Sequence, residues 1–257
     1  MVLSPAKAMR FDTPPAAPLT TPDLKADIAE LAGRTVRLRE SDLKRMMGIS
    51  DTLASLNRAR FQAFDPACED GVQAAFAFNG DVYLGLDARS LDRKALAWAQ
   101  DHVRILSGLY GVLRPLDAVQ AYRLEMGVAL RTRRGRTLYQ FWKAPVARAL
   151  KAAAAGHADP TLVNLASQEY FGAVDVDALG LPVVTCHFRE DHEGLSRVIS
   201  FYAKRARGLM ARYAIERRID RAEDLKRFNL EDYAFQPALS GPCDWVFSRR
   251  QPPLKSR

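Results

Sequence analysis

The fold is decided by an apolar run at residues 105–115, ILSGLYGVLRP. Its first residues are branched and apolar and stop at Ser107, a pattern that predicts a buried strand. Gly108 and Gly111 permit backbone conformations that other residues avoid, and they let a ligand approach the main chain. Arg114 adds a bidentate fork that suits phosphate. The glycine spacing matches neither the Walker A loop nor the dinucleotide-binding fingerprint, so we expect a strand and a turn that present Arg114 to another kind of ligand.

Three further runs of strand character end on a serine, as the first run does. They are MVLS, VNLAS and RVIS, which end at Ser4, Ser167 and Ser200. Residues 74–78 and 181–188 also have strand character. Helical patterns lie between these runs, at residues 92–103, 144–155 and 203–219. Continuous apolar strands that alternate with helices predict an α/β fold of mixed type, with α+β as the variant, in which helices flank a central, mostly parallel sheet.

Basic residues follow the predicted strand ends. Lys7 comes after the first strand, and the helix after the last one carries Lys204 and Arg207, with Arg212 on its flank. The carboxyl ends of parallel strands meet at one edge of a sheet, and ligands collect there. If the strands are neighbours, these cations and Arg114 share one basic cleft. The serines also suit ordinary helix caps and turns, and the basic helix face also suits a solvated surface.

A helical hairpin is predicted at residues 40–64. Ser41 caps a first helix that ends at Gly48, and Ser50 caps a second helix that runs to about residue 64. A glycine between apolar residues in such a turn is typical of a helix-hairpin-helix, which contacts nucleic-acid phosphates without reading bases. Arg58 lies further along the second helix. Plain packing of two helices explains the same pattern.

The chain length and the net charge limit the classes of protein to which the sequence can belong. The 257 residues suit one large domain or two modest ones, and we expect a single α/β domain at residues 1–247 that contains the hairpin, followed by a basic tail at 248–257. Lys and Arg outnumber Asp and Glu by 38 to 30, which gives a formal net charge of +8. This surplus favours polyanionic partners, although a solvated basic surface accounts for it too.

Cysteine and histidine usage argues against a metal or disulfide framework. The three cysteines, Cys68, Cys186 and Cys243, are far apart and contain no CxxC pair, which suits reduced, buried thiols. The four histidines are not spaced as ligands, so we expect no metal and no cofactor. No run reaches the roughly 18 apolar residues of a membrane span, and the start lacks the pattern of a secretory signal. We therefore expect a soluble, cytoplasmic protein without a membrane partner.

Seven strings along the chain resemble those of a known family. They are SPAK at residues 4–7, GDVYLGL at 80–86, LSGLYGVLRPLD at 106–117, YRLEMG at 122–127, LYQFW at 138–142, NLAS with EYF at 164–171, and FYAKRARGLMARY at 201–213. Their order and spacing agree as well. The sequence is therefore similar to the bacterial peroxide stress resistance protein YaaA family over nearly its whole length.

The resemblance implies a cytosolic protein that protects cells during hydrogen peroxide stress by limiting free iron and DNA damage. It also implies DNA binding through a basic cleft and a helix-hairpin-helix, which corresponds here to residues 43–61. No catalytic residue and no cofactor follow from it. Together with the residues named above, it gives the expected DNA contacts: Lys7, Gly48, Ser50, Arg58, Arg114, Arg123, Lys204, Arg207 and Arg212.

Two functions stay open as alternatives. The first is binding of duplex or distorted DNA through its phosphates, with little sequence preference. The second is binding or turnover of a nucleotide-like phosphorylated small molecule at the strand ends, with Lys7 and Arg114 on the phosphate. Glu125 or Glu169 would then act as the acid or base. A purely structural role leaves the convergence of cations unexplained.

Overall fold

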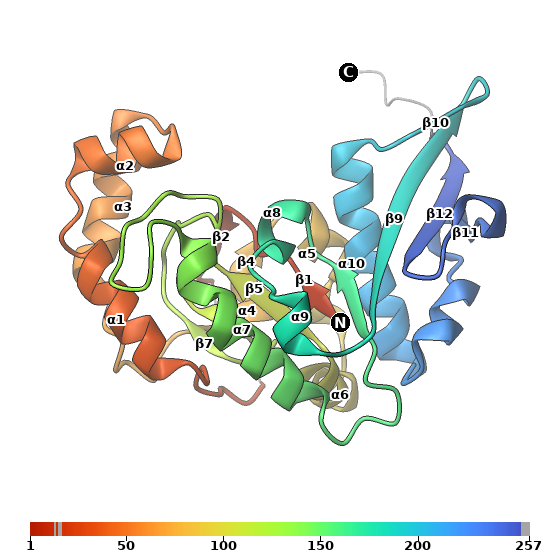
Figure 1. The fold of residues 1–257 in the computed structure, drawn as a ribbon, viewed down its shortest axis with the longest axis horizontal. Helices are drawn as coiled ribbons and strands as arrows, with labels where there is room; N and C mark the ends of the chain where they lie inside the picture. Colours follow the sequence, from red (N-terminus) through yellow and green to blue (C-terminus); the bar gives the residue numbers. More distant parts are fainter. Residues whose placement is uncertain (13, 15–16, 253–257) are drawn as a thin grey trace.

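A central sheet runs through the computed structural model, which describes residues 1–12, 14 and 17–252 (Figure 1). Eight strands of the described residues form this sheet. In spatial order they are β11 (Ala234–Phe235), β12 (Asp244–Arg250), β9 (Val183–His192), β8 (Leu162–Leu165), β1 (Val2–Leu3), β5 (Arg104–Ser107) and β6 (Gly111–Leu113), with β10 (Leu195–Arg197) paired to β9. The pairs among β12, β9, β8, β1 and β5 are parallel. This confirms the expected α/β fold with a mostly parallel sheet.

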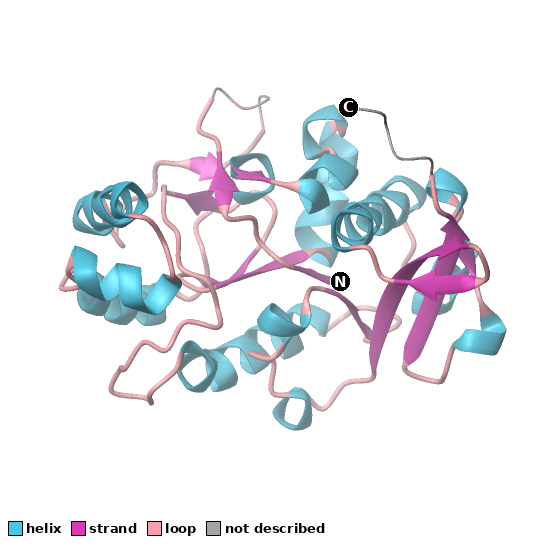
Figure 2. Cartoon of the chain, turned by 90° about the horizontal axis from the view of Figure 1, so that it is seen from above, coloured by secondary structure: helices cyan, strands magenta, loops and turns pink. Residues whose placement is uncertain are grey.

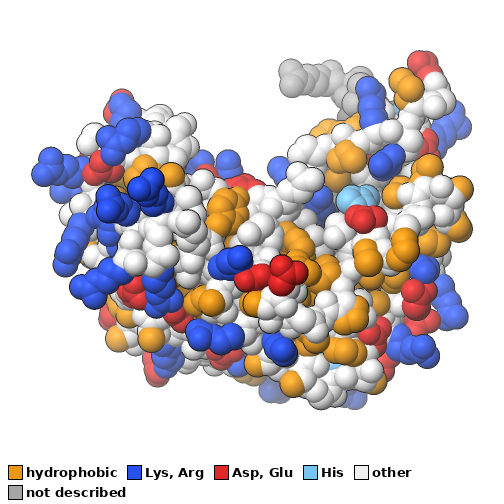
Figure 3. All heavy atoms as spheres, viewed as in Figure 1, with side chains coloured by type: hydrophobic (Ala, Val, Ile, Leu, Met, Phe, Trp, Pro, Cys, Tyr) orange, Lys and Arg blue, Asp and Glu red, His pale blue; other side chains and the backbone are white. Residues whose placement is uncertain are grey.

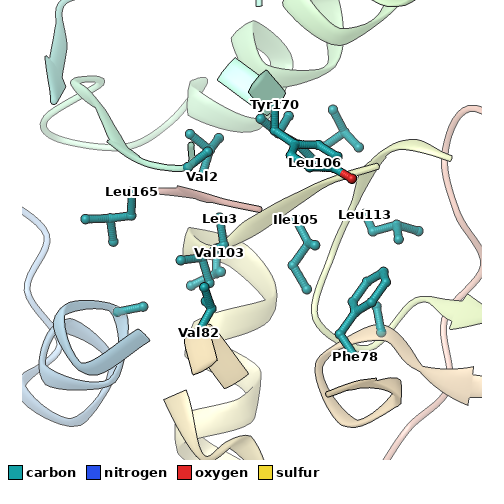
Figure 4. Packing of buried hydrophobic residues seen from close by; sticks show 14 of the residues in the cluster. Val2, Leu3, Phe78, Val82, Val103, Ile105, Leu106, Leu113, Leu165 and Tyr170 are labelled. Carbon is teal, nitrogen blue, oxygen red and sulfur yellow. The ribbon is translucent and has the colours of Figure 1, made fainter. Parts of the chain in front are cut away.

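Strand β1 lies at the centre of the sheet because its residues are apolar on both faces. Val2 and Leu3 are fully buried and pair with β5 on one side and with β8 on the other. Figure 4 shows Val2 beside Leu106 on one face and Leu3 beside Ile105 on the opposite face. Consecutive apolar residues are what a parallel strand needs when helices cover both faces.

Helices lie on both sides of the sheet (Figure 2). The longer ones are α1 (Lys25–Thr35), α2 (Glu40–Met47), α3 (Asp51–Ala63), α6 (Arg93–His102), α7 (Leu138–Ala154) and α10 (Ser200–Arg217). The shorter ones are α4 (Ala74–Ala77), α5 (Asp81–Leu86), α8 (Gln168–Phe171) and α9 (Val176–Leu179), with 3₁₀ turns at Ala88–Ser90, Ala222–Arg227, Leu230–Asp232 and Pro237–Leu239. Two small two-stranded sheets complete the fold: β2 (Ala8–Met9) with β4 (Phe78–Asn79), and β3 (Val72–Gln73) with β7 (Ala118–Val119).

Two of the expected strands are wrong. Residues 74–78 form helix α4 and only the first residue of β4, because a short alanine-rich apolar run suits a buried helical turn as well as a strand. The run that ends at Ser200 is not a strand either: β10 stops at Arg197, Val198 is exposed, and Ser200 is the first residue of α10. This segment is a connection that leaves the sheet edge.

Helix starts depend on caps, and two of them differ from expectation. Helix α7 begins at Leu138, six residues before the expected start, because the Thr137 hydroxyl accepts a hydrogen bond from the Gln140 amide. Helix α2 is capped at Arg39 rather than at Ser41, since the Asp42 carboxylate accepts from the Arg39 amide. The expected cap of α3, Ser50, is correct: its hydroxyl accepts from the Leu53 amide.

Strand β12 continues into the segment expected as a tail. Ser248 and Arg249 are buried in this strand. The Arg249 guanidinium donates to the buried Glu190 at 2.9 Å and to the partly exposed Glu231 at 3.0 Å, so this cation is engaged within the fold. The end of the expected tail, residues 253–257, lies outside the described residues.

Helices α5 and α10 cross at very short range because each has a glycine at the contact. A Cβ added at Gly208 would lie 1.8 Å from the Val82 carbonyl oxygen, and one added at Gly85 would lie 2.2 Å from that of Arg205. Such distances leave no room for any side chain. The crossing fixes α10 beside α5, and thereby beside the sheet edge at which β1 ends.

We expect Gly208→Ala to lower the free energy of unfolding by about 3 kcal/mol, because the added methyl group must push the two helices apart. The matched control is Gly33→Ala in α1, where a Cβ meets nothing within 4 Å. That change should stabilise the protein by roughly 0.5–1 kcal/mol through helix propensity. Chemical denaturation of both variants checks the prediction, and a Gly208→Ala variant as stable as the wild type would contradict the close crossing.

Candidate functional site

The molecule has a hollow between two lobes, visible in the space-filling view (Figure 3). One lobe holds α1, α2 and α3, and the other holds α10 with β9 and β10, as Figure 1 shows. Helix α8, which follows β8, lies at the bottom of the hollow between them. The carboxyl ends of β1, β5 and β8 therefore point toward the floor of the hollow, where ligands of open parallel sheets bind.

The expected serines meet at this edge and are engaged within the protein. Ser4 Oγ accepts from the Ser167 amide at 2.8 Å and lies 3.2 Å from Ser167 Oγ. Ser107 Oγ lies 2.6 Å from the Tyr122 hydroxyl and accepts from the Tyr110 amide at 2.9 Å. The Ser4–Ser167 pair joins the ends of β1 and β8, and Ser107 Oγ closes the turn after β5. Ser167 precedes α8 without a side-chain cap hydrogen bond, and Ser200 lies within α10.

Lys7, Arg123 and Glu125 come together beside the serines. Glu125 Oε1 accepts from Arg123 Nε at 3.0 Å and from Nη2 at 2.8 Å, and Lys7 Nζ lies 3.5 Å from the same oxygen. Glu125 is buried, with 9% of its surface exposed, whereas the Lys7 side chain is 67% exposed. We call Ser4, Lys7, Ser107, Tyr122, Arg123, Glu125, Ser167 and Tyr170 the strand-end cluster.

Three buried tyrosines, Tyr83, Tyr122 and Tyr170, lie within or against this cluster, and none of them was among the site residues predicted from the sequence. The Tyr83 hydroxyl donates to the Ser4 carbonyl at 3.0 Å. Burial is the largest cause that raises the pKa of Tyr83, Tyr122 and Tyr170 far above the ordinary value. All three remain neutral phenols at physiological pH. The signal for Tyr83 and Tyr170 lay in the GDVYLGL and EYF strings, where a tyrosine stands near a strand end.

Arg114 does not belong to the strand-end cluster, and its expected position is wrong. Strand β6 runs antiparallel to β5, with Ile105 opposite Leu113, so the chain returns after Gly111 to the edge at which β5 begins. There Arg114 donates to Asp117 at 2.8 Å and to the Thr21 carbonyl at 2.7 Å. The Arg114 guanidinium is therefore bound to the buried Asp117 carboxylate, at the edge of the sheet opposite to the hollow.

The three cations expected on α10 differ in their environment. Lys204 is exposed near the start of the helix. Arg207 is largely covered: burial lowers its pKa, and its Nε is buried without a hydrogen-bond partner among the described residues. Arg212 lies two turns beyond Lys204, where it donates to the Asp87 carbonyl at 2.9 Å and to Ser90 Oγ at 2.7 Å. Of the three, Lys204 is the one fully available to a ligand in the hollow.

The expected hairpin residues lie on the opposite lobe. Gly48 ends α2 with a left-handed backbone conformation, at φ +61°, and it is exposed. A Cβ added at this position would meet no atom within 4 Å. Ser50 opens α3, and Arg58 lies along that helix, 3.8 Å from Glu40. The structure thus places Gly48, Ser50 and Arg58 on one lobe, Lys204 and Arg207 on the other, and Lys7 with Arg123 at the sheet edge between them.

Within the described residues, no group of three or more His, Cys, Asp or Glu side chains is arranged to hold a metal ion. No helix in the described part of the chain combines the length and the apolar character needed to cross a membrane.

Comparison with known proteins identifies the family. A family model described as peroxide stress protein YaaA matches residues 1–239. A UPF0246 protein of Caulobacter vibrioides (strain NA1000 / CB15N) is 66% identical over 253 residues, which cover 98% of this chain and 99% of that protein. A UPF0246 protein of Delftia acidovorans (strain DSM 14801 / SPH-1) is 52% identical over 256 residues, which cover 97% and 98%. The resemblance of the seven strings is thereby confirmed, and the chain belongs to the peroxide stress protein YaaA family.

Proposed function

We propose that this protein acts in the peroxide stress response by binding DNA phosphates in the hollow between its two lobes. The observation that carries the proposal is the hollow itself, open to solvent and bordered by exposed basic side chains. An open groove of this kind suits a long polyanion better than a small molecule, which calls for an enclosed pocket.

The charge of the α1–α3 lobe supports an anionic partner. Residues 34–60 hold seven Lys and Arg against three Asp and Glu, and Lys and Arg side chains gather on this lobe in Figure 3. Most of the seven are exposed, as is Lys204 on the facing lobe. Several ion pairs within the lobe, such as Lys44 with Asp51 at 2.5 Å, reduce the field without cancelling it.

The α2–α3 turn supports backbone contact with phosphate. The exposed Gly48 leaves the turn open to a close approach, and the first amides of α3 have no partner within the helix. A helix amino terminus with such amides attracts anions. Contacts of this kind fix a protein on DNA and carry no sequence information, so binding would be similar for unrelated sequences.

Protection against iron-driven damage would then be indirect. The described residues contain no cluster of three or more His, Cys, Asp or Glu side chains that could hold a metal ion, and the features that support a partner are the basic side chains of the lobes.

We expect Gly48→Ala to weaken DNA binding about tenfold, because a Cβ in the turn keeps a phosphate away from the amides. The control is Gly156→Ala in the loop between α7 and β8, where φ is +89° and a Cβ also meets nothing within 4 Å. Both variants should lose about 1 kcal/mol of stability through backbone strain. Fluorescence anisotropy with a labelled duplex separates them, and an equal affinity of the two folded variants would remove the hairpin from the interface.

Salt dependence tests whether both lobes face one DNA molecule. We expect Arg58→Gln and Lys204→Gln each to make the slope of log affinity against log salt shallower by about 0.9, and the double variant by about twice that value. The control pair is Arg148→Gln with Lys151→Gln, two exposed cations near the end of α7, which leads to the amino end of β8. An unchanged slope in the double variant, or a loss of affinity that is limited to one DNA sequence, would contradict the proposal.

A further inference from the structure

Arg207 is a largely covered cation that makes no hydrogen bond and no ion pair within the described part of the chain. It projects from α10 toward β9, where its guanidinium lies close to the buried Cys186 thiol, and burial lowers its pKa. Its Nε is buried without a partner. A buried donor that stays unpaired destabilises the folded state until a ligand supplies an acceptor.

Two other arginines of α10, one on each side of Arg207 in the sequence, have carboxylate partners. Arg205 Nε donates to Glu231 at 2.7 Å, and Arg212 Nε lies 2.8 Å from Glu216 Oε1. No described carboxylate contacts Arg207. The unpaired state therefore belongs to the position of Arg207 and is not common to the basic residues of this helix.

Lys204 stands beside Arg207 on α10 and is also unpaired. Side chains three residues apart on a helix are neighbours, and long side chains lean toward the amino end of their helix, which brings the Arg207 fork toward Lys204. The Lys204 side chain is exposed and makes no ion pair with any described residue. Two neighbouring like charges repel each other, and an anion between them would remove this repulsion.

The pair borders the hollow between the lobes, because α10 runs along one side of it (Figure 1). Cys186 follows Thr185, which pairs with Asn164 of β8, so the Arg207 guanidinium lies near the level at which β8 ends. Ligands collect at such strand ends. Within the described chain, Nε is the one nitrogen of Arg207 that is both buried and unpaired. The two terminal nitrogens, which make no hydrogen bond either, are therefore open to solvent and to an anion.

The two cations define the ligand as a phosphate group. The arginine fork places two parallel N–H groups on two oxygens of a phosphate or carboxylate, and the lysine adds a point charge. A carboxylate would have both oxygens on the fork and one negative charge against two positive ones. A phosphate monoester keeps a third oxygen for Lys204 and carries about −1.5 to −2 charges at pH 7, whereas a backbone diester carries one.

We propose that Arg207 and Lys204 together bind one phosphate monoester group. The group belongs either to the end of a nucleic-acid strand or to a phosphorylated small molecule, since the chemistry of recognition is the same. This inference goes beyond the proposed contact with backbone phosphates and does not depend on the α2–α3 turn.

Thermal unfolding in methyl phosphate, with dimethyl phosphate as the diester at equal ionic strength, tests the proposal. Methyl phosphate at about ten times its Kd should raise the Tm of the wild type by about 3–5 °C, and dimethyl phosphate should raise it much less. Arg207→Met should lose the shift, although without ligand it should unfold at the wild-type temperature or above, because the unpaired Nε is gone. Arg205→Met is the matched control and should keep the shift. No shift in the wild type, an equal shift with the diester, or a full shift in Arg207→Met would overturn the proposal.

A second variant separates a fitted site from a diffuse positive field. Arg207→Lys keeps the charge and loses the fork, so it should weaken methyl phosphate binding at least fivefold by isothermal titration; wild-type affinity in this variant would overturn the proposal. Single strands with a 5′-phosphate or a 5′-hydroxyl distinguish the two sources. An Arg207-dependent preference for the 5′-phosphate assigns the site to strand ends, and equal binding of both strands assigns it to a small molecule. Gly48→Ala should keep the methyl phosphate shift, so failure of duplex binding at the lobes is read separately.

Discussion

A two-residue strand, β1, joins the two halves of the sheet, since Val2 and Leu3 pair with β5 on one side and β8 on the other. Neither residue has any exposed surface, so removing either one leaves unpaired backbone groups and unfilled space in the core. The strand ends after Leu3, and the next residues therefore leave the sheet between the ends of β5 and β8. That exit places Ser4 against Ser167 and Tyr83, and Lys7 against Glu125.

Two kinds of surface surround the point at which β1 leaves the sheet: a buried sheet edge and the exposed lobes above it. At the sheet edge, Glu125 is buried and accepts from Arg123, and the buried Tyr122 and Tyr83 hydroxyls bond to Ser107 Oγ and to the Ser4 carbonyl. On the lobes above, Arg58 and Lys204 are exposed on single helices. A rigid, partly dry floor suits recognition of one chemical group, and an exposed basic rim suits a field that attracts phosphate from any sequence.

Several of the parallel strands and long helices could be predicted from the sequence because each is a local pattern, whereas helix α1 and strand β12 were not predicted. Residues 105–107 are a buried strand, and residues 183–188 belong to one, since continuous apolar residues have few other solutions. The direction in which the chain continues after a turn is not determined by a local sequence pattern. Gly111, at φ +70°, starts a strand that runs back along β5, and this reversal carries Arg114 away from the hollow although it follows a strand end in sequence.

The partners of charged residues could not be predicted from the sequence either. Arg249 belongs to a run that has the composition of a solvated tail, yet it is buried against Glu190 and Glu231, which lie 59 and 18 residues earlier. Arg212 shares a helix with Lys204 but is held by the end of α5. Net charge and spacing give the number of cations near a surface, and only the fold determines which of them a carboxylate or carbonyl has already engaged.

We propose above that nucleic acid occupies the hollow between the lobes. Hydrogen–deuterium exchange of the protein with and without a duplex measures this most directly, because amides covered by a ligand exchange more slowly. We predict added protection in the α2–α3 turn at residues 47–52 and around the start of α10 at residues 198–204, with none at residues 114–118 on the opposite edge of the sheet. Protection limited to that opposite edge, or a bound duplex that changes exchange in neither lobe, would contradict the account.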